Sequence, residues 1–89
     1  MNPARTATLL VSCRDRTGLV AALSDFVFRR KGNILDADQH AERDTGQFFM
    51  RLSWDLSSFE LDEDTTHRAM EVMSKRFDLE WELSFDAKS

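Results

Sequence analysis

The sequence has 89 residues and a mass of 10.3 kDa, which is enough for one small domain and too short for two. Hydrophobic residues make up 42% and charged residues 31%, a globular balance that excludes a disordered chain. The net charge of −4 and the pI of about 5.0 argue against a nucleic-acid-binding protein, and no apolar run is long enough to cross a membrane.

The N-terminus lacks a signal-peptide pattern, so we expect a cytoplasmic protein. The single cysteine, Cys13, cannot form an internal disulfide, and together with His40 and His67 it does not supply the ligands of a structural zinc site. We therefore expect no metal and no cofactor, and a fold that packing alone must stabilise.

Residues 7–13 alternate between apolar and other side chains, which predicts a half-buried strand. From Leu19 onward the apolar residues recur with a helical period, which predicts a helix over residues 18–31. Basic residues fill its last turn, and we expect Gly32 to supply a left-handed residue that ends it.

Residues 33–42 have a weak strand pattern, residues 44–46 form a turn, and residues 48–54 alternate strongly, so the three segments predict a hairpin. Acidic residues then begin a second predicted helix that covers residues 62–77. Residues 79–85 have the clearest alternation in the chain and predict the last strand.

The order βαββαβ predicts an α+β, ferredoxin-like fold, with a four-stranded antiparallel sheet and both helices on one face. The domain is expected to span residues 7–85, after an N-terminal tail of residues 1–6 and before a polar segment of residues 86–89. The predicted core consists of inward apolar residues: Leu9, Val11, Leu23, Val27, Met50, Leu52, Met73, Phe77, Trp81 and Leu83.

The turn between the first strand and the first helix is the most informative segment for function. Backbone N–H groups at a helix start attract anions, and Gly18 lets a ligand approach the backbone closely. The same residues also fit a plain tight turn in which Asp15 or Thr17 caps the helix, and on the local pattern alone this simpler interpretation is favoured.

His40 stands among acidic residues that would share its face of the strand, a pattern that fits either a general base or a polar surface. We favour the surface, because no nucleophile or oxyanion-binding glycine motif accompanies it. His67 fits an exposed helix residue, and Cys13 fits a small buried hydrophobe. The sequence therefore predicts no catalytic residue.

Two segments of the chain resemble the two usual motifs of the amino-acid-binding ACT domain family: Asp15-Arg16-Thr17-Gly18-Leu19 and Gly32-Asn33-Ile34. Thr17 stands where that family usually has proline. The resemblance implies a small amino-acid effector. It implies the following ligand-binding residues: Asp15, Thr17, Gly18, Leu19, Asn33 and Ile34. We expect sheet pairing to bring the two segments close together.

The segments Asp38-Gln39-His40 and Gly46-Gln47-Phe48-Phe49-Met50-Arg51 are similar to the N-terminal regulatory domains of the formyltetrahydrofolate deformylase family, and the resemblance runs from about residue 8 to residue 85. It implies an enzyme that hydrolyses 10-formyltetrahydrofolate to formate and tetrahydrofolate for purine biosynthesis. The catalytic residues of such an enzyme would lie in a formyltransferase-like domain, and residues 86–89 would begin the linker to that domain. The 89 residues alone are therefore expected to be inactive.

An alternative stays open: a free-standing ACT regulator, similar to glycine cleavage repressors, that acts by protein–protein contact. Under either reading Phe28 and Phe49 are large apolar side chains on faces that the core does not use, so we expect both to lie at the interface of a homodimer. The one-carbon setting of the resemblance suggests glycine or methionine as the effector.

Overall fold

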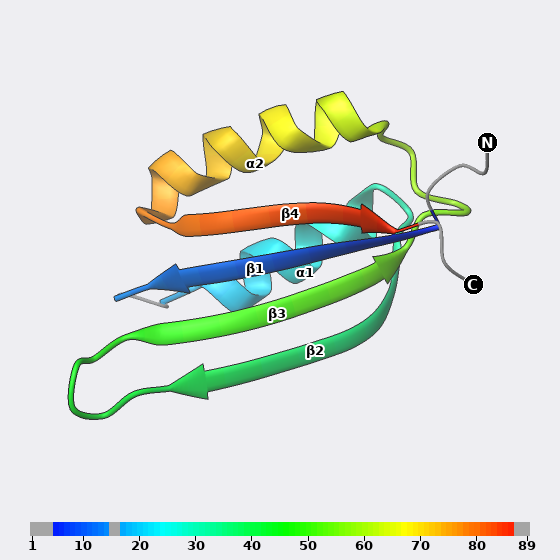
Figure 1. Ribbon diagram of the computed structural model, residues 1–89. Helices are drawn as coiled ribbons and strands as arrows, with labels where there is room; N and C mark the ends of the chain where they lie inside the picture. Colours follow the sequence, from blue (N-terminus) through cyan, green and yellow to red (C-terminus); the bar gives the residue numbers. More distant parts are fainter. Residues whose placement is uncertain (1–4, 15–16, 87–89) are drawn as a thin grey trace.

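Four strands form one antiparallel sheet in the computed structural model, which describes residues 5–14 and 17–86. The sheet order is β2-β3-β1-β4, so that β2 and β4 are the edges (Figure 1). The bounds of the strands are β1 (Thr6–Cys13), β2 (Asn33–Ala41), β3 (Phe48–Asp55) and β4 (Glu80–Asp86). Each strand follows from the alternation of apolar residues that the sequence predicts, with β2 the weakest.

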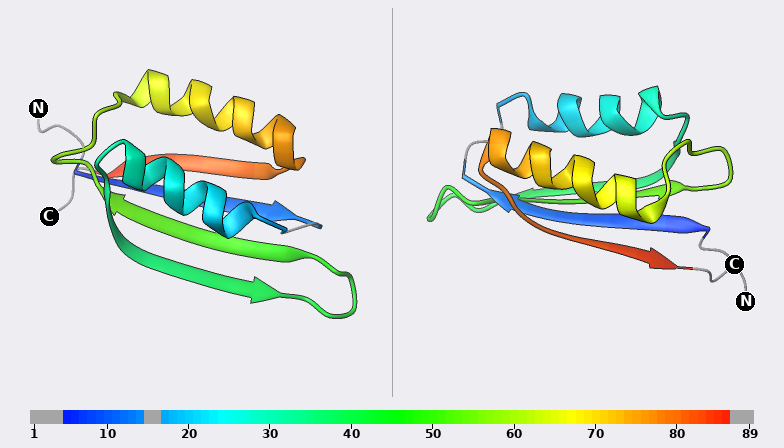
Figure 2. Two further views of the ribbon diagram at one scale, coloured as in Figure 1. Left: turned by 180° about the vertical axis from the view of Figure 1, so that it is seen from behind. Right: turned by 90° about the horizontal axis from the view of Figure 1, so that it is seen from above.

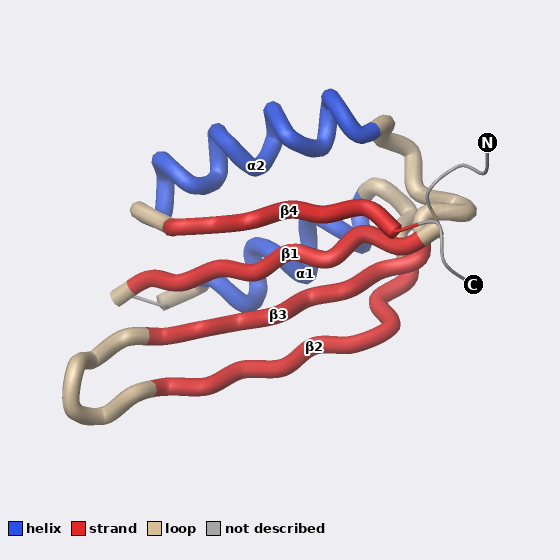
Figure 3. Tube along the Cα trace, viewed as in Figure 1, coloured by secondary structure: helices blue, strands red, loops and turns tan. Residues whose placement is uncertain are grey.

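Two helices, α1 (Leu19–Arg29) and α2 (Glu63–Phe77), lie on one face of this sheet. Figure 2 shows both on the same side of the strands, and Figure 3 shows the two layers by secondary structure. The predicted ferredoxin-like βαββαβ fold is confirmed. The opposite face of the sheet, which we call the open face, is covered by no described helix.

The core lies between the helices and the inward residues of the three strands β1, β3 and β4. Its buried members from the predicted set are Leu9, Val11, Leu23, Val27, Met50, Leu52 and Leu83. Three predicted members, Met73, Phe77 and Trp81, are only half-buried at the rim of the core. Trp54 and Leu19 are fully buried instead, and Cys13 is buried as expected.

The end of α1 differs from the prediction. The left-handed residue is Lys31, with φ 64°, and not Gly32. Lys31 N–H donates to the carbonyl of Phe28, and Gly32 N–H donates to the carbonyl of Val27 at 2.9 Å, which satisfies the last carbonyls of the helix. Gly32 is needed for space, because a Cβ there would lie 2.7 Å from Val27 Cγ1 and 2.9 Å from Phe59.

Asp62 caps the start of α2, with its carboxylate accepting the backbone N–H of Thr65 at 2.8 Å. This hydrogen bond holds the pKa of the exposed Asp62 carboxyl below its ordinary value. Thr66 is fully buried, and its hydroxyl donates to the carbonyl of Asp62 at 2.7 Å. The acidic first turn that indicated this helix in the sequence therefore also fixes where the helix begins.

The edge strand β2 is exposed along its whole length. Its register with β3 shifts between Ile34 and Asp36, so Leu35 is an extra residue in the ladder. After the shift, Asp36 and Asp38 lie opposite Ser53 and Arg51, and they face the open side together with His40, which lies opposite Phe49.

We expect the Gly32→Ala substitution to lower the free energy of unfolding by about 1–3 kcal/mol, because the added methyl group enters space that Val27 fills. Val27→Ala should cost about 2 kcal/mol through the cavity that it leaves. The double variant should lose clearly less than the sum, as measured by urea unfolding. Additive losses would show that the two side chains do not compete for the same space.

A second prediction concerns Asp62 and pH. A carboxyl whose folded pKa is lowered stabilises the fold above its unfolded pKa of about 4, and this contribution is lost as the pH falls through the folded pKa. The loss of stability caused by Asp62→Ala should therefore be largest near pH 7 and shrink below pH of about 4 in thermal melts. A pH-independent loss would contradict this, and Asp62→Asn, which keeps an acceptor without the charge, is the matched control.

Candidate functional site

The turn into α1 leaves space beside its backbone. Gly18 precedes the helix with φ 75°, a conformation that disfavours side chains, and a Cβ on it would meet no atom within 4 Å. The first turn of α1 contains no acidic residue, and its N-cap residue, Gly18, supplies no side-chain cap. Thr17 is exposed beside Gly18, whereas Asp15 lies outside the described residues. This turn can present N–H groups to an anion.

Leu19 has a different role from the one that the resemblance implied for it. Its side chain is 0% exposed and belongs to the core below α1. It therefore anchors the turn against the sheet, and any contribution to ligand binding from this residue must come from its backbone.

Asn33 and Ile34 lie at the opposite end of α1, which corrects the expectation that sheet pairing brings them near Gly18. Cys13, just before the turn, pairs with Phe48 at one end of the sheet, whereas Asn33 pairs with Asp55 at the other end. Figure 1 shows α1 running the length of the sheet between these ends. Its 11 residues span about 16 Å, so one small ligand cannot touch both segments within one chain.

Asp55 is a candidate site residue that the sequence reasoning missed. It lies opposite Asn33 in the register, and the backbone N–H of Ser57 donates to its carboxylate at 2.7 Å. This hydrogen bond holds the pKa of the Asp55 carboxyl below its ordinary value, so the group is ionised near neutral pH. The Asp-x-Ser pattern at residues 55–57, typical of an Asx turn, was the available signal.

Phe28 and Phe49 are both exposed, by 76% and 42%, but they lie on different surfaces. Phe28 belongs to α1 and is not among the residues that line the hollow between α1 and α2. Phe49 belongs to the open face of the sheet.

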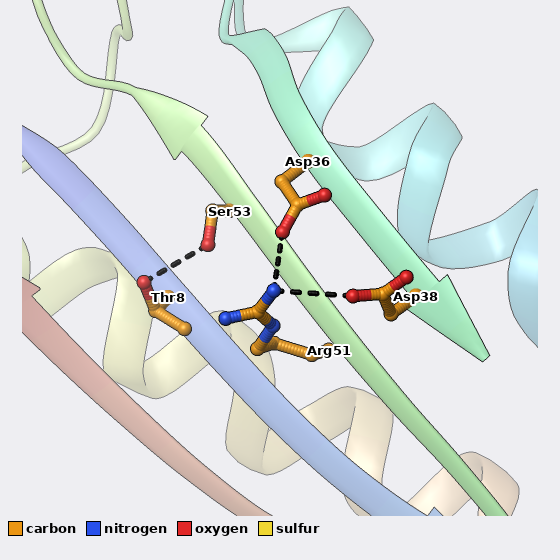
Figure 4. Close-up of polar contacts among 5 residues, drawn as sticks. All are labelled: Thr8, Asp36, Asp38, Arg51 and Ser53. Carbon is orange, nitrogen blue, oxygen red and sulfur yellow. Dashed lines mark hydrogen bonds and ion pairs between the residues drawn. The ribbon is translucent and has the colours of Figure 1, made fainter. Parts of the chain in front are cut away.

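Arg51 organises the polar residues of the open face (Figure 4). Its guanidinium donates to the carboxylates of Asp36 and Asp38, the second at 3.1 Å. On the same face the hydroxyl groups of Thr8 and Ser53 lie 3.0 Å apart. These pairs are largely exposed, so they contribute little to stability, and their importance lies in the charge pattern that they create.

His40 lies on this face as a surface residue, as expected. Its ring stacks on Phe49, with centroids 6.4 Å apart and planes 27° apart. The neighbouring carboxylates of Asp36 and Asp38 are directed to Arg51 and do not orient the imidazole. The arrangement lacks the acid–His pair that a general base needs.

Over residues 5–14 and 17–86, no group of three or more His, Cys, Asp or Glu side chains is placed to hold a metal ion. Within the same ranges, neither helix has the length and apolar character required to span a bilayer.

Comparison with known proteins shows that residues 7–75 match the sequence pattern of the ACT domain. The formyltetrahydrofolate deformylase of Synechocystis sp. is 38% identical over 80 residues, which cover 90% of this chain and 28% of that protein. The chain therefore spans little more than a quarter of the length of this relative.

Solved structures also resemble this chain. The crystal structure of a formyltetrahydrofolate deformylase from Pseudomonas syringae pv. tomato superposes with a TM-score of 0.87 and 30% identity, over 98% of this chain and 29% of that chain. A protein assigned as a glycine cleavage system transcriptional repressor superposes with a TM-score of 0.84 over 99% of this chain and 50% of that chain. Its 17% identity shows a shared fold alone.

Proposed function

The chain belongs to the ACT domain family, and from this premise we propose that it is the regulatory, amino-acid-binding domain of a formyltetrahydrofolate deformylase. The observation that carries the proposal is the 38% identity to a deformylase over 90% of the chain. Hydrolysis of 10-formyltetrahydrofolate to formate and tetrahydrofolate, which would supply purine biosynthesis in the cytoplasm, then belongs to a formyltransferase-like domain in the same native chain.

Two copies of the chain can assemble the effector site that one copy cannot. The end of β2, at Ala41, pairs with Phe48 and so lies at the same end of the sheet as the turn before α1. If two copies pair their β2 edges antiparallel about a two-fold axis, the start of one β2 lies beside the end of the other. Asn33 of one copy then approaches Gly18 of the other.

The chemistry of this composite site fits a free amino acid. The N–H groups at the start of α1 and the open space beside Gly18 suit the carboxylate. The Asn33 amide oxygen and the ionised Asp55 carboxylate, contributed by the second copy, suit the ammonium group. The one-carbon role of the proposed enzyme favours glycine or methionine, and so small a ligand should bind weakly.

The surface around β2 supports this pairing. The strand is an exposed edge with free backbone hydrogen-bonding groups, and Ile34 and Leu35 are among its exposed apolar side chains. Phe28 is an exposed apolar side chain on α1, the helix that contacts β2, and it does not line the hollow between α1 and α2. Arg51 offsets part of the charge that Asp36 and Asp38 would bring to the interface.

A second candidate function is a free-standing ACT regulator that acts by protein–protein contact. The structural likeness to the protein assigned as a glycine cleavage repressor favours it, but that likeness, at 17% identity, extends to the fold only. The higher identity to deformylases makes the enzyme-linked role the better supported one.

Calorimetric titration of the 89-residue chain with the twenty amino acids should identify at least one ligand that binds at millimolar concentration or better. Gly18→Val should abolish binding by filling the space beside the turn, and Asn33→Ala should weaken it about tenfold by removing the amide. Gly46→Val is the matched control, because Gly46 has a similar φ of 73° and equally open surroundings. Absence of any ligand, or equal loss in the control, would contradict the site.

Self-association provides a further prediction. Sedimentation should show a dimer at tens of micromolar, and Phe28→Ser should shift it toward the monomer by removing an apolar side chain from the interface. Val72→Ser is the control, since Val72 is also exposed, by 71%, but lies on α2. A monomeric wild type, or equal effects of the two substitutions, would count against this interface.

A further inference from the structure

Acidic side chains are frequent on the open face of the sheet. Within the four strands six carboxylates point to this side together with one guanidinium, that of Arg51, and the charge of Arg5, just before β1, also acts on Asp55. The six residues are Asp36, Asp38, Asp55, Glu80, Glu82 and Asp86. The strand residues of the open face are therefore predominantly acidic.

Two apolar side chains stand on the inner strands β1 and β3 of this face. The strand pairing places side chains in rows across the sheet, and the two rows nearest the β2–β3 hairpin contain them. Read from β2 to β4, these are Asp38, Arg51, Leu10 and Glu82, followed by His40, Phe49, Ser12 and Glu80. Leu10 and Phe49, exposed by 43% and 42%, are diagonal neighbours in these rows and form one apolar ridge.

Hollows flank the Leu10–Phe49 ridge on both sides. One of about 480 Å³ lies toward β2 and is bordered by Asp38, His40 and Arg51. Another of about 280 Å³ lies toward β4 and is bordered by Glu80 and Glu82. Leu10 and Phe49 line both hollows, so the two hollows lie on either side of the same apolar ridge.

We propose that the open face is a docking surface for a basic amphipathic α-helix of a protein partner. The acidic residues of β2 and β4 stand three strand spacings apart, about 14 Å, and a helix is about 10–12 Å wide. A helix lying on the ridge would place its apolar stripe on Leu10 and Phe49. Lysine or arginine side chains on its two flanks would reach the acids of the two edge strands.

Three other kinds of ligand fit the open face less well, two of them because of its acidic residues. Single-stranded nucleic acid binds similar sheets through exposed aromatic residues, but its phosphates would be repelled by the excess of carboxylates on this face. A second copy stacked face to face would oppose two surfaces of the same sign. An added strand needs unpaired backbone groups, which a sheet offers at its edges and not on its face.

This docking surface goes beyond the proposed effector site, with which it shares only Asp55 at the far end of the open face. The β2 edge and Phe28, which we assign to the homodimer, leave the open face uncovered. Phe49 is therefore assigned to a different partner from Phe28, and its contribution can be measured with no amino-acid effector present.

The test uses a labelled 18-residue helical peptide with a leucine stripe and lysine flanks, and a counterpart with glutamate in place of lysine. Fluorescence anisotropy with the 89-residue chain should show binding of the lysine peptide only. Leu10→Ser and Phe49→Ser should each weaken binding about tenfold or more. Glu82→Gln should weaken it less and reduce its dependence on salt.

Controls separate this surface from other exposed groups. Phe28→Ser and Val72→Ser remove exposed apolar side chains from the helices and should leave the affinity within about twofold. Amide NMR shifts of the wild-type chain with the peptide should map to β1 and β3 and not to α1, which tests the site without any substitution. Failure of the lysine peptide to bind, equal binding of the glutamate peptide, preference for a thymidine oligonucleotide, or shifts on α1 would overturn the proposal.

Discussion

The path of α1 along the sheet is the constraint on which the arrangement of this domain depends. The helix must bury Leu19, Leu23 and Val27 against β1 and β3, so it runs the length of those strands before the chain can return as β2. The start of the helix and the start of the next strand are then about 16 Å apart. The two segments that resemble an effector site are thus separated by the packing that stabilises the fold, which is why the proposed site uses a second copy.

The one-sided covering of the sheet has a second consequence. Alternation along each strand sends apolar residues to the helices and leaves the other half of the side chains in water. In β1 and β3 that outer half includes Leu10 and Phe49, while in β2 and β4 it is mostly acidic. An apolar ridge between two acidic edges arises from four separate strand patterns, and it exists only once the strands are in register.

The spacing of apolar residues predicted every strand and helix, because an element that buries one face carries apolar residues at regular intervals in the sequence. The sequence did not reveal that Lys31 adopts the left-handed conformation, because a glycine at the end of a helix is usually the residue that adopts it. Here Gly32 is required because Val27 and Phe59 leave no space for a side chain. The rows across the open face and the separation of Gly18 from Asn33 depend on strand pairing, which a single sequence does not specify. Asp55 was overlooked for the same reason.

The central claim is that one effector site is built from Gly18 of one copy and Asn33 of another, and mixing two defective variants tests it most directly. Gly18→Val and Asn33→Lys chains, each unable to bind the effector alone, would be unfolded together and refolded as a mixture. If the site is shared, each mixed dimer contains one intact site, so calorimetry should recover about a quarter of the wild-type binding capacity. If both residues act within one chain, every site in the mixture remains defective, and a mixture that binds no more than its parents would contradict the account.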